Sequence, residues 1–182
     1  MARRRVFPAG KQAAIALLVW LCLPPLARSV DELPPLEYRV KAAFLLNFTK
    51  FVEWPAAAFA DDRAPFRICV LGEDPFGSVL DQMVKDEVMG GRRLMVQRIS
   101  RPPEPKSCQV VFVSRQEKAT PPALGPGVLT VGEGEEFLRE GGMIAFVIEN
   151  RRVRFDISQK AAAGARLTIS SRLLNVARLV EK

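Results

Sequence analysis

The sequence predicts a single α/β domain in which a mixed, mostly parallel sheet of about six strands is flanked by helices. Short apolar runs such as ICVLG and VVFV lack the alternation of polar and apolar residues that marks a half-exposed strand. Such runs are typical of strands covered on both faces. They alternate along the chain with segments whose apolar residues repeat at helical spacing, and this order favours helices packed on a largely parallel sheet.

The elements follow in order from residue 37. Helical spacing predicts a helix over 37–53 that Pro55 ends, with a buried face that includes Val40, Ala43, Phe44 and Phe48. Asp74 is expected to cap a second helix, with Pro75 at its first position. The six expected strands are 66–71, 93–99, 108–114, 128–131, 143–148 and 153–157.

The second half of the chain predicts three further features. A short helix over 135–139 ends at a Gly-Gly pair, and the last two strands flank residues 149–152 as a β-hairpin. A final helix is expected to start near Ser170 or Ser171, with its buried residues at Leu173, Leu174, Ala177 and Val180.

The first 29 residues have the order of a secretory signal peptide. Three arginines and Lys11 precede an apolar run over 13–23, and Ala27, Arg28 and Ser29 form a cleavage site before Val30. The run is too short for a membrane span, which needs about 20 residues. We therefore expect residues 1–29 to be removed and 30–182 to form the exported domain.

Loss of this segment lowers the net charge of the chain. The whole chain carries a net charge of +7, but five of its 27 basic residues and none of its 20 acidic residues lie in the first 29 positions. The expected mature chain therefore keeps 22 basic residues against 20 acidic ones. The basic excess belongs mostly to the export signal, so a nucleic-acid partner is not expected.

Export also bears on the cysteines. Cys22 leaves with the signal, and Cys69 and Cys108 lie on predicted strands. A pair in an oxidising compartment predicts a disulfide, which would stabilise the fold by about 4 kcal/mol on the chain-entropy model. Two buried free thiols are the alternative, and zinc is disfavoured because the chain has no histidine to complete a ligand set.

Residues that carry catalysis are scarce. Without histidine, no Ser-His-Asp or Cys-His arrangement is possible. The turn GEDPFG follows a strand, but it lacks the lysine of a phosphate-binding loop, and Glu73 and Asp74 would repel phosphate. We expect a binding or inhibitory module that is not an enzyme, with no metal and no cofactor. The alternative, from a different functional class of protein, is an enzyme that uses only carboxylates and lysine.

Two stretches favour a binding surface. Trp54 ends the first helix, and Arg172 lies at a helix N-terminus, where the helix dipole disfavours a cation. The expected partner- or ligand-binding residues are Glu53, Trp54, Ser171, Arg172 and Asn175. The structural alternative places Trp54 in the core, uses the serines as helix caps, and pairs Arg172 with a carboxylate such as Glu149 or Asp156.

Five blocks in order resemble one family. They are YRVKAAFLLNFTKFVEWP, ICVLGEDPFG, the strand that Cys108 opens, GGMIAFVIENRRVRFDI, and LTISSRLLNVA. Together they make the sequence similar to the periplasmic YfiR repressors, also titled HmsC-like or DUF4154, from Tyr38 to about Val180.

This resemblance implies a periplasmic homodimer with a sheet of six or seven strands. It implies repression of an inner-membrane, YfiN-like diguanylate cyclase through its periplasmic sensor part. A YfiB-like outer-membrane lipoprotein would sequester the repressor and so release cyclic-di-GMP synthesis and biofilm formation. Cys69 and Cys108 match the family's structural disulfide, whereas residues such as Ala145 and Asn150 stand near the place of a second bridge that some members carry. The alternative is a periplasmic small-ligand sensor for another signalling system, with a pocket near Trp54 and Arg172.

Overall fold

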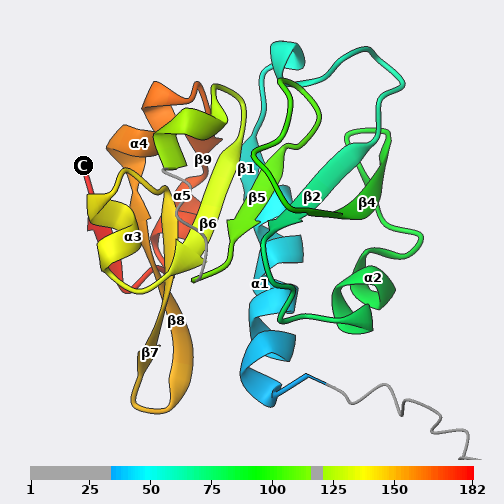
Figure 1. Ribbon diagram of the computed structural model, residues 1–182. Helices are drawn as coiled ribbons and strands as arrows, with labels where there is room; N and C mark the ends of the chain where they lie inside the picture. The colour runs from blue at the N-terminus through cyan, green and yellow to red at the C-terminus, as the bar shows by residue number, and fades with distance from the viewer. Residues whose placement is uncertain (1–33, 116–120) are drawn as a thin grey trace, which may run out of the picture. The chain divides into compact units, whose positions relative to one another are not determined.

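The computed structural model describes residues 34–115 and 121–182 (Figure 1). The predicted signal peptide and its cleavage after Ser29 lie outside the described residues. The compact unit Leu33–Lys182 is described below.

Helices and strands alternate along this unit. The α-helices are α1 (Leu36–Phe51), α2 (Ser78–Val84), α3 (Glu136–Arg139), α4 (Gln159–Gly164) and α5 (Ser171–Leu174), and the 3₁₀ turns are η1 (Ala56–Ala58) and η2 (Pro121–Leu124). The strands are β1 (Val52–Glu53), β2 (Phe66–Leu71), β3 (Val88–Met89), β4 (Arg92–Ile99), β5 (Val110–Val113), β6 (Leu129–Glu133), β7 (Ile144–Glu149), β8 (Arg152–Ser158), β9 (Thr168–Ile169) and β10 (Leu179–Glu181).

The main sheet is larger and more mixed than the sequence predicts. Within the described residues it has eight strands in the order β10-β8-β7-β6-β5-β2-β4-β3 (Figure 1). All six predicted strands are present, and the run from β7 to β4 is parallel. The expectation of about six strands was too low because β3 and β10 are only two and three residues long and show no apolar pattern. Antiparallel pairing of β3 with β4 and of β7 with β8 makes the sheet mixed.

Each face of the sheet packs on a separate apolar cluster. One face meets α1 and α2, through residues such as Ile68, Val70 and Phe112. The other face packs against α3 and η2, through residues such as Leu71, Val111 and Val113. Successive residues of a strand point to opposite faces, so strands buried on both sides need continuous apolar runs. This requirement explains why the short apolar runs predicted the central strands.

Helix α1 buries a face that is rotated from the predicted one. Its buried apolar residues are Ala42, Leu45 and Phe48, and the buried set also includes Lys41 and Thr49. Phe44 is half-buried and packs with Phe48 against the rings of β7 and β8, at centroid distances of 5.1 to 6.1 Å. The predicted face did not include Lys41, which is buried because it pairs with Glu37 and with buried Glu133.

Two predicted helix boundaries are wrong. Asp74 does not cap α2: its Oδ1 accepts a hydrogen bond from the Phe76 backbone N–H at 2.8 Å, which makes a tight turn. Gly77 has a φ of +52°, so α2 begins only at Ser78. The final helix ends at Leu174, and Val180 lies in β10, which pairs with β8 next to the bond between Arg178 and Asp156.

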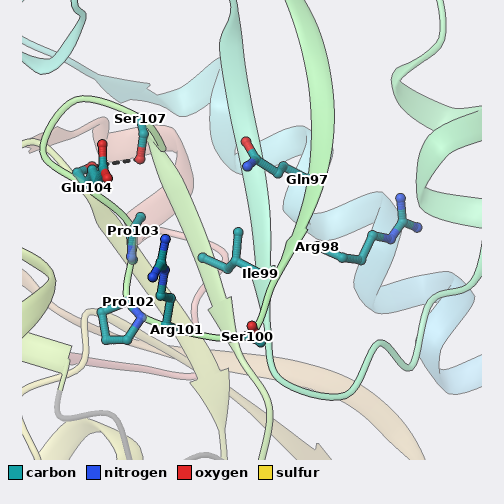
Figure 2. Close-up of a pocket in the computed structure, with 9 residues that line it drawn as sticks. All are labelled: Gln97, Arg98, Ile99, Ser100, Arg101, Pro102, Pro103, Glu104 and Ser107. Atoms are coloured by element: carbon teal, nitrogen blue, oxygen red, sulfur yellow. Dashed lines mark hydrogen bonds between the residues drawn. The ribbon is translucent and has the colours of Figure 1, made fainter.

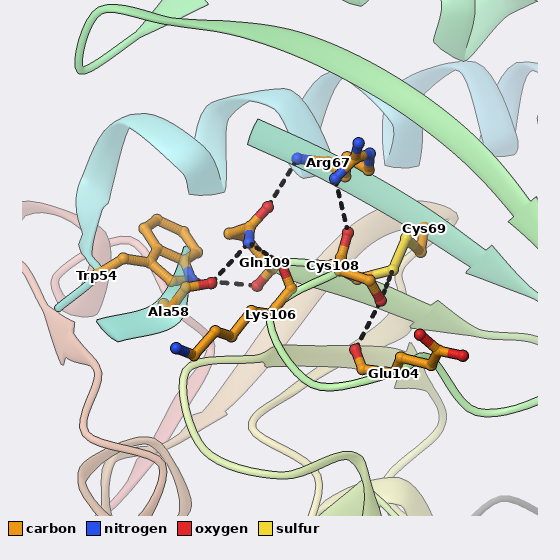
Figure 3. Close-up of a disulfide and its surroundings, with 9 residues drawn as sticks. Trp54, Ala58, Arg67, Cys69, Glu104, Lys106, Cys108 and Gln109 are labelled. Carbon is orange, nitrogen blue, oxygen red and sulfur yellow. Dashed lines mark hydrogen bonds between the residues drawn. A yellow bond between two sulfur atoms is a disulfide. The ribbon is translucent and has the colours of Figure 1, made fainter. Parts of the chain in front are cut away.

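The disulfide between Cys69 and Cys108 is present, as predicted. It joins β2 to the residues just before β5 over a Cα–Cα distance of 6.0 Å, and both residues are buried. Next to it, the Gln109 side chain donates to Ala58 O at 2.8 Å and accepts from the Arg67 N–H at 2.9 Å (Figure 3). The bridge and Gln109 together hold β2 against the residues that lead into β5.

Candidate functional site

The predicted binding residues lie on neighbouring elements. Glu53 pairs with Thr168 in the small β1–β9 sheet, and the Ser170 N–H donates to Phe51 O at 2.9 Å. This pairing brings the start of α5 beside the end of α1. Within this region, Glu53, Ser171, Arg172 and Asn175 are all exposed.

Trp54 differs from the other four residues. Its indole Nε1–H donates to the Gln109 carbonyl at 3.1 Å, and its ring packs edge-to-face on Phe66 at 4.8 Å between centroids. Figure 3 shows the indole directed toward the Gln109 region. The half-buried ring therefore makes packing contacts, which agree with the structural alternative.

Arg172 does not form the ion pairs that the structural alternative expects. Asp156 is bound by Arg178, and Glu149 lies 3.9 Å from Arg154. Within the described residues, Arg172 has no carboxylate oxygen within 4.0 Å. The serine part of that alternative is met at Ser170, whose Oγ caps α5 by accepting from the Leu173 N–H at 3.4 Å.

A crevice lies at the carboxyl edge of the parallel strands. It has a volume of about 260 Å³ and is lined by Tyr38, Glu73, Pro75, Phe112, Ser114, Arg115 and Glu133. Glu73 follows β2, Ser114 and Arg115 follow β5, and Glu133 ends β6. None of the predicted binding residues lines this crevice.

A chain of charges with a buried centre supports one wall of the crevice. Lys41 of α1 is 1% exposed and contacts both Glu37 and Glu133, while the Glu133 side chain is 2% exposed. Glu133 also pairs with Arg115, at 2.5 Å between Nε and Oε2. Two carboxylates and two cations therefore alternate, and every buried charge has an opposite partner, as buried charges require.

Tyr38 closes the same wall. The Lys41 Nζ lies 4.4 Å from the centre of the Tyr38 ring, a cation–π distance. Burial raises the pKa of the Tyr38 hydroxyl, and the negative charge of Glu133 raises it further. Both effects favour the protonated phenol, which is a hydrogen-bond donor.

Three larger hollows lie elsewhere, one of them a groove of about 340 Å³ along α1 that Val40 and Phe44 line. The largest of these three, of about 840 Å³, lies beside α3 and α4 and has Leu138, Met143 and Ala161 among its lining residues. The third, of about 350 Å³, lies between β4 and the loop 100–107. Figure 2 shows Gln97 and Ile99 turned toward this loop and Arg98 turned away, as strand alternation requires. Arg98 instead binds Asp74 and Asp81, on the α2 side of the sheet.

The described residues contain no group of histidine, cysteine or carboxylate side chains that could hold a metal ion. Among them, no helix has both the length and the apolar character needed to cross a membrane.

These features define an α/β domain with exposed polar side chains around α5 and a crevice at the carboxyl edge of its sheet. Its sequence matches the family model described as YfiR/HmsC-like, DUF4154, over residues 38–178, and the chain belongs to this family. The predicted resemblance is thus confirmed. The family is regulatory and non-enzymatic.

Other comparisons are more distant. A crystal structure described as a conserved domain protein from Vibrio cholerae O1 biovar El Tor strain N16961 is similar at 10% sequence identity and a TM-score of 0.47. The similarity covers 82% of this chain and 61% of that one, so this chain spans less than two thirds of that protein's length. No curated protein matches the sequence.

Proposed function

We propose that this protein is a periplasmic regulator that represses an inner-membrane, YfiN-like diguanylate cyclase by binding its periplasmic sensor part. The observation that carries the proposal is the family match over residues 38–178, which covers nearly all of the described domain. Repression of this kind lowers cyclic-di-GMP and limits biofilm formation. It requires a binding surface and no catalytic group.

Two features support the compartment. The first 29 residues have the order of a secretory signal. The Cys69–Cys108 bridge is typical of proteins in an oxidising compartment such as the periplasm. Both features agree with a repressor that meets its cyclase on the outer side of the inner membrane.

The surface around α5 is our candidate for cyclase binding. Arg172 and Asn175 are exposed there, and the next residues include two exposed apolar side chains, Val176 at 59% and Leu179 at 48%. An exposed arginine beside apolar side chains is a composition that protein interfaces favour. Glu53 adds a carboxylate from the neighbouring β1 strand.

The same proposal includes a homodimer and a second partner. A YfiB-like outer-membrane lipoprotein would sequester the repressor and release the cyclase. Size measurement of the mature protein tests the dimer, and addition of such a lipoprotein to the repressor–cyclase complex tests release.

The test is capture of inner-membrane proteins by the mature protein, with cyclic-di-GMP measured in cells that lack the gene. We expect a membrane-bound diguanylate cyclase in the captured fraction and raised cyclic-di-GMP in the deletion strain. Arg172→Ala should lose capture while keeping the wild-type melting temperature. Arg93→Ala, a change at an exposed arginine on β4, is the matched control and should capture normally.

Two outcomes contradict the proposal. Unchanged cyclic-di-GMP on deletion would favour the alternative, a periplasmic small-ligand sensor for another signalling system. Equal capture by Arg172→Ala and Arg93→Ala would remove the α5 surface from the proposal.

A further inference from the structure

The crevice lies where the strand order of the sheet reverses. After β2 the chain adds β4 on one side, and it then returns to add β5 and β6 on the other side. The connections that leave β2 and β5 therefore run in opposite directions and leave a gap between them. In open α/β sheets, ligands bind outside the carboxyl ends of the strands at this point. Glu73, Ser114 and Arg115 lie at these strand ends and line the crevice.

Two opposite charges face this crevice without pairing to each other. The Arg115 Nε lies 2.5 Å from Glu133 Oε2 and its side chain is 64% exposed, and in the described part of the chain no hydrogen bond from its two terminal nitrogens is found. Glu73 is exposed, and in the same part of the chain no cation lies within 4.0 Å of it. Both residues line the crevice, yet they are not within 4.0 Å of one another.

Lys41 and Glu133 position the Arg115 guanidinium so that it can bind a ligand. Glu133 is bound by Lys41 as well as by Arg115, so it is already neutralised and holds the guanidinium from one side. The remaining edge of a guanidinium has the fork geometry that binds a carboxylate with two parallel hydrogen bonds. An anion without a positive group is disfavoured, because Glu73 would repel it.

We propose that this crevice binds a small zwitterion of amino-acid size. Its carboxylate meets Arg115, and its ammonium group meets Glu73. Phe112 and Pro75 supply an apolar surface between the two charges, and the Tyr38 phenol supplies a neutral donor. A volume of about 260 Å³ lies below the range typical of drug-sized ligands and suits a small metabolite.

The test is titration calorimetry of the mature protein with each of the common L-amino acids. For the best binder, the same molecule without its amino group and the same molecule without its carboxyl group are measured next. We expect one or more amino acids to bind and each analogue to weaken by at least about tenfold, because a hydrogen bond to a charged group is lost.

Glu73→Gln and Arg115→Gln should each weaken the best binder by at least about tenfold. Glu104→Gln and Arg101→Gln are the matched controls, since both residues line the separate hollow beside β4, and they should bind normally. Arg115→Gln removes a partner of buried Glu133 and can lower stability, so Glu73→Gln provides the decisive variant.

Three results would overturn the proposal. The first is that no amino acid binds. The second is that the analogue without an amino group binds as tightly as the amino acid itself, and the third is that Glu73→Gln binds the amino acid as tightly as wild type does. The assay contains no cyclase, so its outcome is independent of the proposed repression.

Discussion

The disulfide offers the most direct test of how this fold is stabilised. Cys69 lies in β2, at the centre of the parallel strands, and Cys108 lies just before β5. The perturbation is the double substitution Cys69→Ala and Cys108→Ala. Alanine is chosen because both positions are buried and a serine hydroxyl would need a hydrogen-bond partner there.

The expected loss follows from the length of the closed loop. The two cysteines are 39 residues apart. Chain entropy for a loop of this size gives a contribution of about 4 kcal/mol to the free energy of unfolding. A domain is typically stable by about 5–15 kcal/mol, so the variant should remain folded in buffer while losing a large part of its stability.

Urea titration of both proteins measures the loss. With a slope of about 2 kcal/mol per molar urea, the unfolding midpoint should fall by about 2 M. Wild-type protein treated with reductant should approach the midpoint of the double variant. The variant itself should not respond to reductant, which controls for effects of the reagent.

Equal midpoints for wild type and double variant would refute this reasoning. That result would mean that β2 and the start of β5 are held together without the bridge. A variant that responds to reductant would show that the reagent acts elsewhere.

Three further substitutions test other contacts. Arg178→Ala leaves Asp156, which is 1% exposed, without its cation, and should cost about 3–5 kcal/mol in a urea titration, with partial recovery in Arg178→Lys. Gly132→Ala would place a Cβ 2.4 Å from the Phe137 ring and should cost about 1–3 kcal/mol by the same titration; a melting temperature equal to wild type would show that the ring moves freely. Lys41→Met removes the buried cation between two carboxylates and should lower the melting temperature, and an unchanged value would count against its ion pairs as a stabilising contact.

The central strands were predictable because the signal for each strand lies within its own residues. A strand buried on both faces must be apolar at nearly every position, and β2 and β5 meet that rule in their own sequence. The β7–β8 hairpin was predictable for a similar reason, since Asn150 and Arg151 form its turn with positive φ values.

The short elements were not predictable. Strands β1, β3 and β9 have two residues each, too few for any apolar pattern. Helix α4 has the sequence QKAAAG, which shows no apolar stripe. Strand β10 pairs with β8, and Arg178 beside it binds Asp156, a contact between residues 22 positions apart. The predicted helix continued to Val180 because local spacing contains no information about this contact.

The sequence by itself determined the class of fold, the six long strands, the disulfide pair and the family. The fold class, the strands and the family can be inferred from patterns of neighbouring residues, and the disulfide pair from the small number of cysteines. Only the tertiary structure decided the charged crevice, where Lys41 and Glu133 meet across 92 positions. Carboxyl ends of parallel strands come together only after the strand order is set. That order depends on pairing between distant segments, so residues that look like solvated surface charges in sequence become partners in one site.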